Sequence, residues 1–357
     1  MTGMSRTLFF FGAGLSSACG VPDSRAMSNE FKQQMNSRGQ MELLRIFQNM
    51  EGRFPARESD MERIYTLITD RKDHNYFKNR SNSIYDDIYL DLFYDFNKEM
   101  EFDVLQKEIE SFLYRKSWIM NFNYGPLAGI LPVEFIRSNI NDITLSTTNY
   151  DLLIENHFSH MGIHNLLNTG LDREGFLDVS YLGKPLMIDY LKLHGSVNLY
   201  QDSKGRVRHS PGPVVNGTIT EFGDIVKGVH LTHPLDGINN YDSHEACSNL
   251  LFMFEERMDR CEYLILIGTS MRDTSITDII RDHAEKKKVI AVGNRMKYLK
   301  AIPELMSNES VIFHDGYIPD EECDDIFELF RRANRDEIGM DRLMEMADHS
   351  PSDDPGE

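Results

Sequence analysis

The stretch LFFFGAGLSSACGVPDSR, residues 8–25, joins a short apolar run to a turn that contains two closely spaced glycines. An apolar run that ends in Gly-x-Gly is typical of a buried β-strand followed by a tight turn, because glycine permits close approaches that a Cβ atom would forbid. A turn that leads into a helix directs backbone N–H groups and the positive end of the helix dipole at one point. The stretch therefore predicts a strand, a turn and a helix that bind a phosphate group.

Composition and length limit the class of protein. The chain has 357 residues, of which 41% are hydrophobic, enough for one large α/β domain with an insertion or for two ordinary domains. The formal net charge of −19 argues against direct binding of nucleic acid, which needs clustered lysines and arginines. No apolar run is long enough to span a membrane and no signal-peptide pattern precedes residue 8, so we expect a cytoplasmic protein with no membrane contact.

Four cysteines are scattered along the chain, and none forms a C-x-x-C pair. Because zinc modules and disulfide frameworks need closely spaced or paired cysteines, we expect neither a zinc module nor any other metal site.

The chain alternates between β-branched runs and helical patterns after residue 140. The segments that predict strands with polar carboxyl ends are DITLSTTNYD (142–151), DYLKLHGSVNLY (189–200), CEYLILIGTSMRD (261–273) and KKVIAVGNR (287–295). Near-continuous Val, Ile and Leu runs followed by helices are typical of a parallel sheet covered on both faces. The expected fold class is α/β, with a Rossmann-like, doubly wound and mostly parallel sheet, a large helical insertion and no zinc module.

The remaining patterns predict the domain boundaries. Apolar residues recur at helical spacing across a region rich in charged and aromatic residues, whereas another region is rich in Gly, Pro, His and Asn. The expected organisation is a nucleotide-binding core of residues 1–27 and 140–320, a helical insertion at 28–139, a loop-rich insertion at 200–245, a C-terminal helical segment at 321–347 and a disordered acidic tail at 348–357.

The predicted strands all end in small or polar residues. If they are parallel neighbours, their carboxyl ends share one edge of the sheet, where α/β proteins bind ligands. The five strand ends are Gly12–Ser16, Thr147–Asp151, His194–Ser196, Gly268–Ser270 and Gly293–Arg295. Together they predict a nucleotide-sized crevice that offers backbone donors, hydroxyls, an amide, a carboxylate and an imidazole.

The order and the residues of these segments resemble the sequence motifs of the sirtuin family. The family's fingerprint is G-A-G-x-S followed by G-I/V-P-x-F/S-R, then T-x-N-I/Y-D, a His-Gly pair, G-T-S and V-x-N. This chain has GAGLSSACGVPDSR (12–25), TTNYD (147–151), LHGS (193–196), GTS (268–270) and VGN (292–294) in that order. The resemblance runs from Leu8 to about Tyr317 and leaves the helical insertion unmatched.

The resemblance implies that the crevice binds NAD. It assigns Gly12, Ala13, Gly14 and Ser16 to the diphosphate, Gly268, Thr269 and Ser270 to its other side, and Asn294 to the adenosine ribose. It also assigns Pro22, Asp23 and Arg25 to a flexible loop over the nicotinamide end, and Asn149, Asp151 and His194 to the nicotinamide ribose and the carboxamide pocket.

Two departures from the family separate this chain from protein-deacylating sirtuins. The chain lacks the two C-x-x-C pairs that hold zinc, and Ser24 stands where an aromatic residue usually precedes the loop arginine. A serine leaves more room for water as the nucleophile.

In both respects the chain is similar to the NAD-consuming sirtuin-like domains of bacterial antiviral defence. The resemblance then implies an NAD glycohydrolase that depletes NAD in an antiphage system, as a homo-oligomer restrained by a partner such as a HerA-type ATPase, a short argonaute or a phage protein.

The chemistry assigns catalytic roles to two residues. The nicotinamide of NAD is a good leaving group, so the protein has to hold the ribose and place a water rather than protonate the leaving group. Asn149 can position that water or a ribose hydroxyl, and His194 can accept a proton near neutral pH. Structural roles remain open at this point: Asn149 and Asp151 also fit the start of a helix, and a histidine before glycine is often a turn residue.

Two other functions also remain open. The same fold serves protein deacylases and ADP-ribosyltransferases, which require a peptide groove. A protein that binds NAD or ADP-ribose without cleaving it, as an oligomeric scaffold, would carry many of the same motifs.

Overall fold

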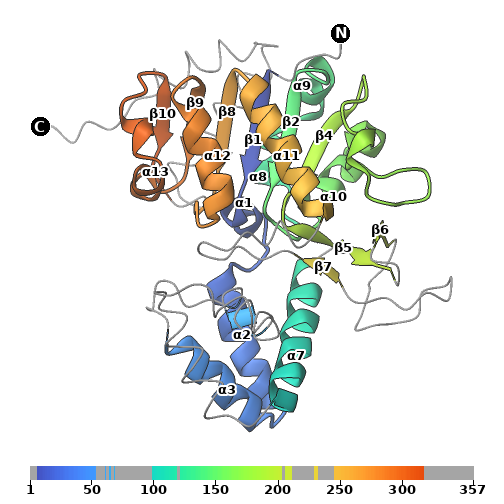
Figure 1. The fold of residues 1–357 in the computed structure, drawn as a ribbon, viewed down its shortest axis with the longest axis vertical. Coiled ribbons are helices and arrows are strands. Elements are labelled where there is room, and N and C mark those ends of the chain that lie inside the picture. The colour runs from blue at the N-terminus through green and yellow to red at the C-terminus, as the bar shows by residue number, and fades with distance from the viewer. Residues whose placement is uncertain are drawn as a thin grey trace, which may run out of the picture.

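A seven-stranded sheet forms the centre of the protein, with β1 in its middle (Figure 1). The computed structural model describes residues 6–53, 61, 64, 65, 68, 99–118, 121–202, 206–210, 229–231 and 245–316. The strand order is β10-β9-β8-β1-β2-β4-β3, and every neighbouring pair is parallel. The strands span Thr7–Phe11 (β1), Ile143–Thr147 (β2), Leu167–Asn168 (β3), Ile188–Lys192 (β4), Tyr263–Ile267 (β8), Lys288–Val292 (β9) and Val311–His314 (β10).

Both faces of the sheet are buried, which explains the near-continuous apolar runs. Alternate side chains of a strand point to opposite faces. Phe9 and Phe11 therefore belong to one hydrophobic cluster, and Leu8 and Phe10 belong to another. This arrangement confirms the predicted doubly wound, Rossmann-like α/β fold.

Helices cover each face of the sheet. The first cluster includes residues of α8, α9 and α10, and the second includes residues of α11, α12 and α13. Their bounds are Gly125–Ile130 (α8), Val133–Ser138 (α9), Leu153–His160 (α10), Glu245–Arg260 (α11), Thr274–Ala284 (α12) and Arg295–Ala301 (α13). Short 3-10 helices span His164–Leu166, Val179–Tyr181 and Pro303–Met306.

A helical lobe lies beyond the carboxyl ends of the strands, in the lower half of Figure 1. Its described helices are α2 (Ser24–Ser37), α3 (Met41–Glu51) and α7 (Glu99–Ser117), and the short helix α1 (Ala13–Ala18) lies between β1 and the lobe. Phe31 of α2 packs against Phe47 of α3 and Phe112 of α7, with ring centroids 5.0 Å and 5.3 Å apart. These rings belong to the same hydrophobic cluster as Phe9 and Phe11, so the core continues from the sheet into the lobe.

A second, smaller sheet follows β4. It is antiparallel, in the order β6-β5-β7, and its strands span Gly195–Gln201 (β5), Val207–His209 (β6) and Val229–Leu231 (β7). Gly195 starts β5 with a φ of 80°, a conformation that glycine adopts readily at a sharp change of chain direction.

Some predictions fall outside the part of the chain that the structure describes. They are the C-terminal helical segment at 321–347, the acidic tail at 348–357 and most of the loop-rich insertion at 200–245. Among the helices that the structure describes, none is both long and apolar enough to cross a membrane.

Candidate active site

A cleft of about 410 Å³ lies at the carboxyl edge of the sheet, with walls from the sheet loops, α2 and α7. The five strands whose ends the sequence singled out, β9, β8, β1, β2 and β4, stand next to one another in the sheet. Every predicted site residue lines this cleft: Gly12, Ala13, Gly14, Ser16, Pro22, Asp23, Arg25, Asn149, Asp151, His194, Gly268, Thr269, Ser270 and Asn294.

The glycines after β1 lie against the loop after β8. A Cβ atom on Gly12 would stand 2.4 Å from Cα of Thr269, and one on Gly14 would stand 2.8 Å from Cα of Gly268. The N–H of Gly14 donates to the carbonyl oxygen of Gly268 over 2.8 Å. The assignment of these glycines to a phosphate stays a prediction, and the structure adds a second reason for glycine, the close contact with the chain itself. Their small size lets two neighbouring strand ends meet at the floor of the cleft.

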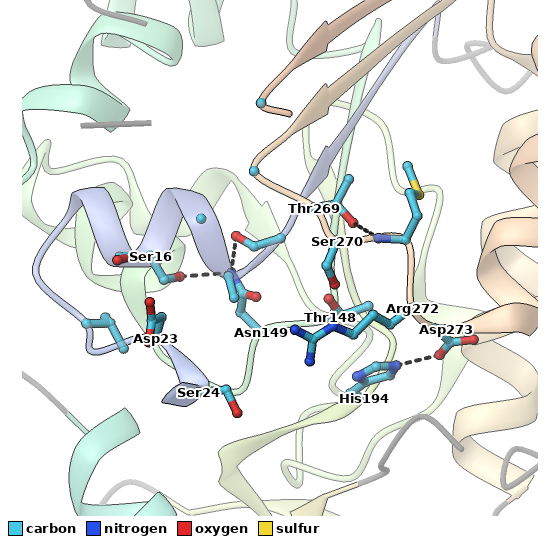
Figure 2. A pocket seen from close by; sticks show the side chains of 18 of the residues that line it. Ser16, Asp23, Ser24, Thr148, Asn149, His194, Thr269, Ser270, Arg272 and Asp273 are labelled. Carbon is cyan, nitrogen blue, oxygen red and sulfur yellow. Dashed lines mark hydrogen bonds and ion pairs between the residues drawn. The ribbon is translucent and has the colours of Figure 1, made fainter. Parts of the chain in front are cut away.

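Asn149 joins the end of β2 to the turn after β1. Its Nδ2 donates to the carbonyl oxygen of Gly12 over 2.9 Å and to Oγ of Ser16 over 2.8 Å (Figure 2). Its backbone N–H donates to Oγ1 of Thr147, which in turn donates to the carbonyl oxygen of Phe11. Both contacts use the NH₂ group, and the other polar atom of the amide, Oδ1, is a hydrogen-bond acceptor.

Asp151 has the structural role that the sequence left open. Its side chain is buried, and Oδ1 accepts from the N–H of Leu153 over 3.0 Å at the start of α10. Its carbonyl oxygen accepts from Nζ of Lys192. Asp151 lines the cleft, but these contacts hold the segment after β2 against the start of α10 and the end of β4.

His194 lies at the end of β4 in a buried position, with 4% of its surface exposed. Its Nε2 is 2.7 Å from Oδ2 of Asp273, as Figure 2 shows. The ring of Tyr150 lies beside the imidazole, with ring centroids 6.1 Å apart. Oδ1 of Asp273 caps α12 by accepting from the N–H of Ile276 over 3.1 Å. The cleft therefore contains a buried histidine–aspartate pair.

The segment around Arg25 is helical, so our assignment of that residue to a flexible loop is wrong. Oδ1 of Asp23 accepts from the N–H of Ala26 over 2.7 Å and caps α2, which begins at Ser24. Aspartate is a favoured N-cap residue, because its carboxylate accepts from a first-turn N–H group. α2 therefore begins before residue 28, where we expected the insertion to start.

The charges of the cleft favour an anionic ligand. Arg25, Arg272 and Lys297 line it with exposed side chains. Its three carboxylates, described above, each accept from a backbone N–H group at a helix start. A cleft whose exposed charges are cationic attracts phosphate groups.

Several residues that line the cleft have no role in the sequence-based prediction. They are Leu113, Ser117, Arg272, Asp273 and Lys297. The first two come from α7, in the helical lobe, and no local pattern marks them. Asp273 does have a local signal, because D-T-S-I after the GTS segment fits a helix N-cap, but that signal does not indicate contact with His194.

Among the described residues, no group of three or more His, Cys, Asp or Glu side chains is placed to hold a metal ion.

Comparisons with solved structures show a likeness of fold. No protein-family model and no curated protein matches the chain. A solved structure of Sir2, in complex with the inhibitor EX-527, 2'-O-acetyl-ADP-ribose and a deacetylated p53 peptide, covers 93% of each chain at 12% identity and a TM-score of 0.40. A likeness at this level carries no argument about function. The fold and the cleft themselves define the class, a Rossmann-like α/β protein with a cleft where the strand order reverses.

Proposed function

We propose that the protein is an NAD glycohydrolase, which cleaves NAD to nicotinamide and linear or cyclic ADP-ribose. The observation that supports this most is the convergence of the five sirtuin-like segments on one cleft, with Asn149 and His194 both lining it. These segments are far apart in the sequence. A coincidental match to the five motifs would not by itself place all of them at one cleft.

The size and charge of the cleft support a dinucleotide as the ligand. Its volume of about 410 Å³ falls in the range of roughly 300–1,000 Å³ that is usual for small-molecule sites. It lies where α/β proteins bind nucleotides, and its exposed cationic side chains suit a diphosphate.

The reaction requires positioning and one proton acceptor. The bond between C1' of the ribose and the nicotinamide nitrogen breaks, and its electron pair neutralises the positive charge on nicotinamide. A new bond forms from water to C1' for the linear product, and the proton of that water passes to His194. Oδ1 of Asn149 accepts a hydrogen bond from the water or a ribose hydroxyl. Positioning and general-base catalysis of this kind contribute about 10²–10⁴-fold in rate.

Ser24 supports hydrolysis over transfer to a peptide. Its side chain lines the cleft, and among the described residues its buried Oγ has no hydrogen-bond partner. A buried hydroxyl is normally satisfied, often by water. Ser24 therefore offers a hydrogen bond to a water in the cleft, where an aromatic side chain would exclude it.

The proposed cellular role rests on the resemblance alone. The missing C-x-x-C pairs and Ser24 favour an effector that depletes NAD during phage infection. Unrestrained NAD loss kills the host, so the activity is restrained by homo-oligomer assembly or by a partner such as a HerA-type ATPase, a short argonaute or a phage protein.

The test is incubation of the full chain with NAD, alone and with the product of the adjacent gene, and measurement of nicotinamide by chromatography. We expect release of nicotinamide without any acylated peptide. Release that depends on an acyl-lysine peptide would indicate a deacylase instead. Bound but unchanged NAD under every condition would indicate a scaffold that does not cleave it.

A further inference from the structure

The two carboxylate oxygens of Asp273 have different partners. Oδ1 accepts from the N–H of Ile276 and caps α12, whereas Oδ2 lies 2.7 Å from Nε2 of His194. Both side chains are buried, with exposed fractions of 5% for His194 and 9% for Asp273. The cap alone needs one oxygen, so the position of the second oxygen calls for an explanation of its own.

The contact determines which ring nitrogen carries the hydrogen. An ionised carboxylate can only accept a hydrogen bond, so Nε2 of His194 must donate. A neutral imidazole has one N–H group, and its other nitrogen is then an acceptor. In Figure 2 the other nitrogen, Nδ1, lies on the side of the ring away from Asp273.

We propose that Asp273 is a positioning residue that holds His194 in the Nε2–H tautomer, so that Nδ1 is the nitrogen that accepts the proton during NAD cleavage. The role in cleavage rests on the proposed function. The proton moves from the attacking water, or from a ribose hydroxyl, to Nδ1, and Asp273 stays ionised throughout. The imidazolium that forms is then paired with a buried carboxylate, which offsets the cost of a positive charge in the interior.

The variant Asp273→Asn separates this role from the helix cap. Asparagine is as good an N-cap residue as aspartate, so its Oδ1 can keep the contact with Ile276. Its NH₂ group then faces Nε2 of His194 and donates to it, which moves the imidazole hydrogen to Nδ1. We expect kcat to fall about 10²–10⁴-fold, while KM for NAD and affinity for ADP-ribose stay unchanged.

The matched control is Asp278→Asn. Asp278 lies on the same helix, its side chain is 59% exposed, and it pairs with Arg281. This variant removes the same charge from α12 without touching His194, so we expect wild-type kcat. A kcat for Asp273→Asn equal to that of the control would overturn the proposal.

The tautomer is measured without any activity, by ¹⁵N NMR of the histidine rings in the full chain. The signals of His194 are assigned by their loss in His194→Gln. We expect a protonated Nε2 and an unprotonated Nδ1 in the wild type, and the reverse in Asp273→Asn. A protonated Nδ1 in the neutral wild-type ring would refute the proposal. If the wild type releases no nicotinamide, the proposed function fails, and the NMR result still decides which nitrogen Asp273 holds.

Discussion

Two buried histidines of this protein have different surroundings. His157 is 1% exposed in the core beside α8, and its Nε2 lies 3.1 Å from the carbonyl oxygen of Leu131. His194 is 4% exposed at the edge of the cleft, and its Nε2 lies 2.7 Å from the carboxylate of Asp273. The two residues are alike in type and in burial, and they differ in the charge of the partner and in access to the cleft.

The difference shows that burial alone does not indicate what a histidine does. Burial lowers the pKa of His157 from its ordinary value of 6.5, because a carbonyl oxygen compensates a buried positive charge only weakly. The carboxylate beside His194 provides a full negative charge. His157 is therefore suited to remain neutral in a packed core, whereas His194 has a charged partner at the edge of the cleft.

The largest expected effect comes from His194→Ala. The loss of the proton acceptor should lower kcat for nicotinamide release by about 10²–10⁴-fold, with affinity for ADP-ribose mostly kept. Steady-state kinetics and calorimetric titration measure the two quantities. His160→Ala, in an exposed position on α10, is the control and should keep wild-type turnover. Full activity in His194→Ala would remove the distinction between the two buried histidines.

Asn149→Ala should have the next largest effect. It removes the two contacts that join the end of β2 to the turn after β1, together with the acceptor Oδ1. The loss of these contacts misplaces the reacting groups, and a misplacement of about 1 Å lowers kcat by about 10²-fold. The control is Asn139→Ala, which removes an amide contact to Phe135 away from the cleft. Equal kinetics in the two variants would show that the side-chain amide of Asn149 does not contribute to catalysis.

Ser24→Phe tests whether access of water, as well as the imidazole, limits the reaction. A phenyl ring in the cleft displaces the water that Ser24 would bind. The loss of one such hydrogen bond, about 1.4 kcal/mol, corresponds to roughly tenfold in the rate of hydrolysis. Ser24→Ala leaves the space open to water and should reduce the rate of hydrolysis less than Ser24→Phe does. The rates of the two variants are compared as initial rates at saturating NAD. A Phe variant as fast as the Ala variant would contradict a role for Ser24 in admitting water.

The smallest effect concerns His157 and the dependence of stability on pH. Its pKa is lowered in the folded state, so the unfolded state takes up a proton first as pH falls below 6.5. The free energy of unfolding therefore decreases from about pH 6.5 downward, by up to about 1.4 kcal/mol per pH unit until the lowered pKa is reached. Urea unfolding at about pH 7 and about pH 5.5 measures this decrease.

The comparison of two variants isolates the contribution of His157. His157→Gln removes the titrating group and should reduce the loss of stability between the two pH values. His164→Gln, in an exposed position on the 3-10 helix His164–Leu166, should keep the wild-type loss. The same pH dependence in both variants would show that other groups cause the destabilisation.

Several features of the site could be predicted from the sequence because they are local. Each strand end is marked by an apolar run followed by small or polar residues, and parallel neighbours place such ends at one edge. This reasoning predicts that Gly12, Asn149, His194 and Gly268 lie together, and all four line the cleft. It did not show that Gly12 packs against its own chain, since that contact depends on which strand is the neighbour of β1.

The features that the sequence did not reveal depend on tertiary contacts. Asp273 is 79 residues from His194 in the chain, and no spacing rule connects them. Leu113 and Ser117 reach the cleft only because α7 packs beneath the sheet edge. The helical start at Ser24 is different, because it does have a local signal. Asp23 fits an N-cap as well as a ligand contact, and the sequence alone does not choose between the two roles.

The contact of Gly12 and Gly14 with residues 268 and 269 has a consequence for biosynthesis. The ribosome makes the turn after β1 first, and the loop that packs against it follows more than two hundred residues later. A nascent chain that still lacks β8 has neither the loop against which that turn packs nor the aspartate that pairs with His194. Ribosome-bound fragments and prematurely terminated products therefore cannot assemble the cleft.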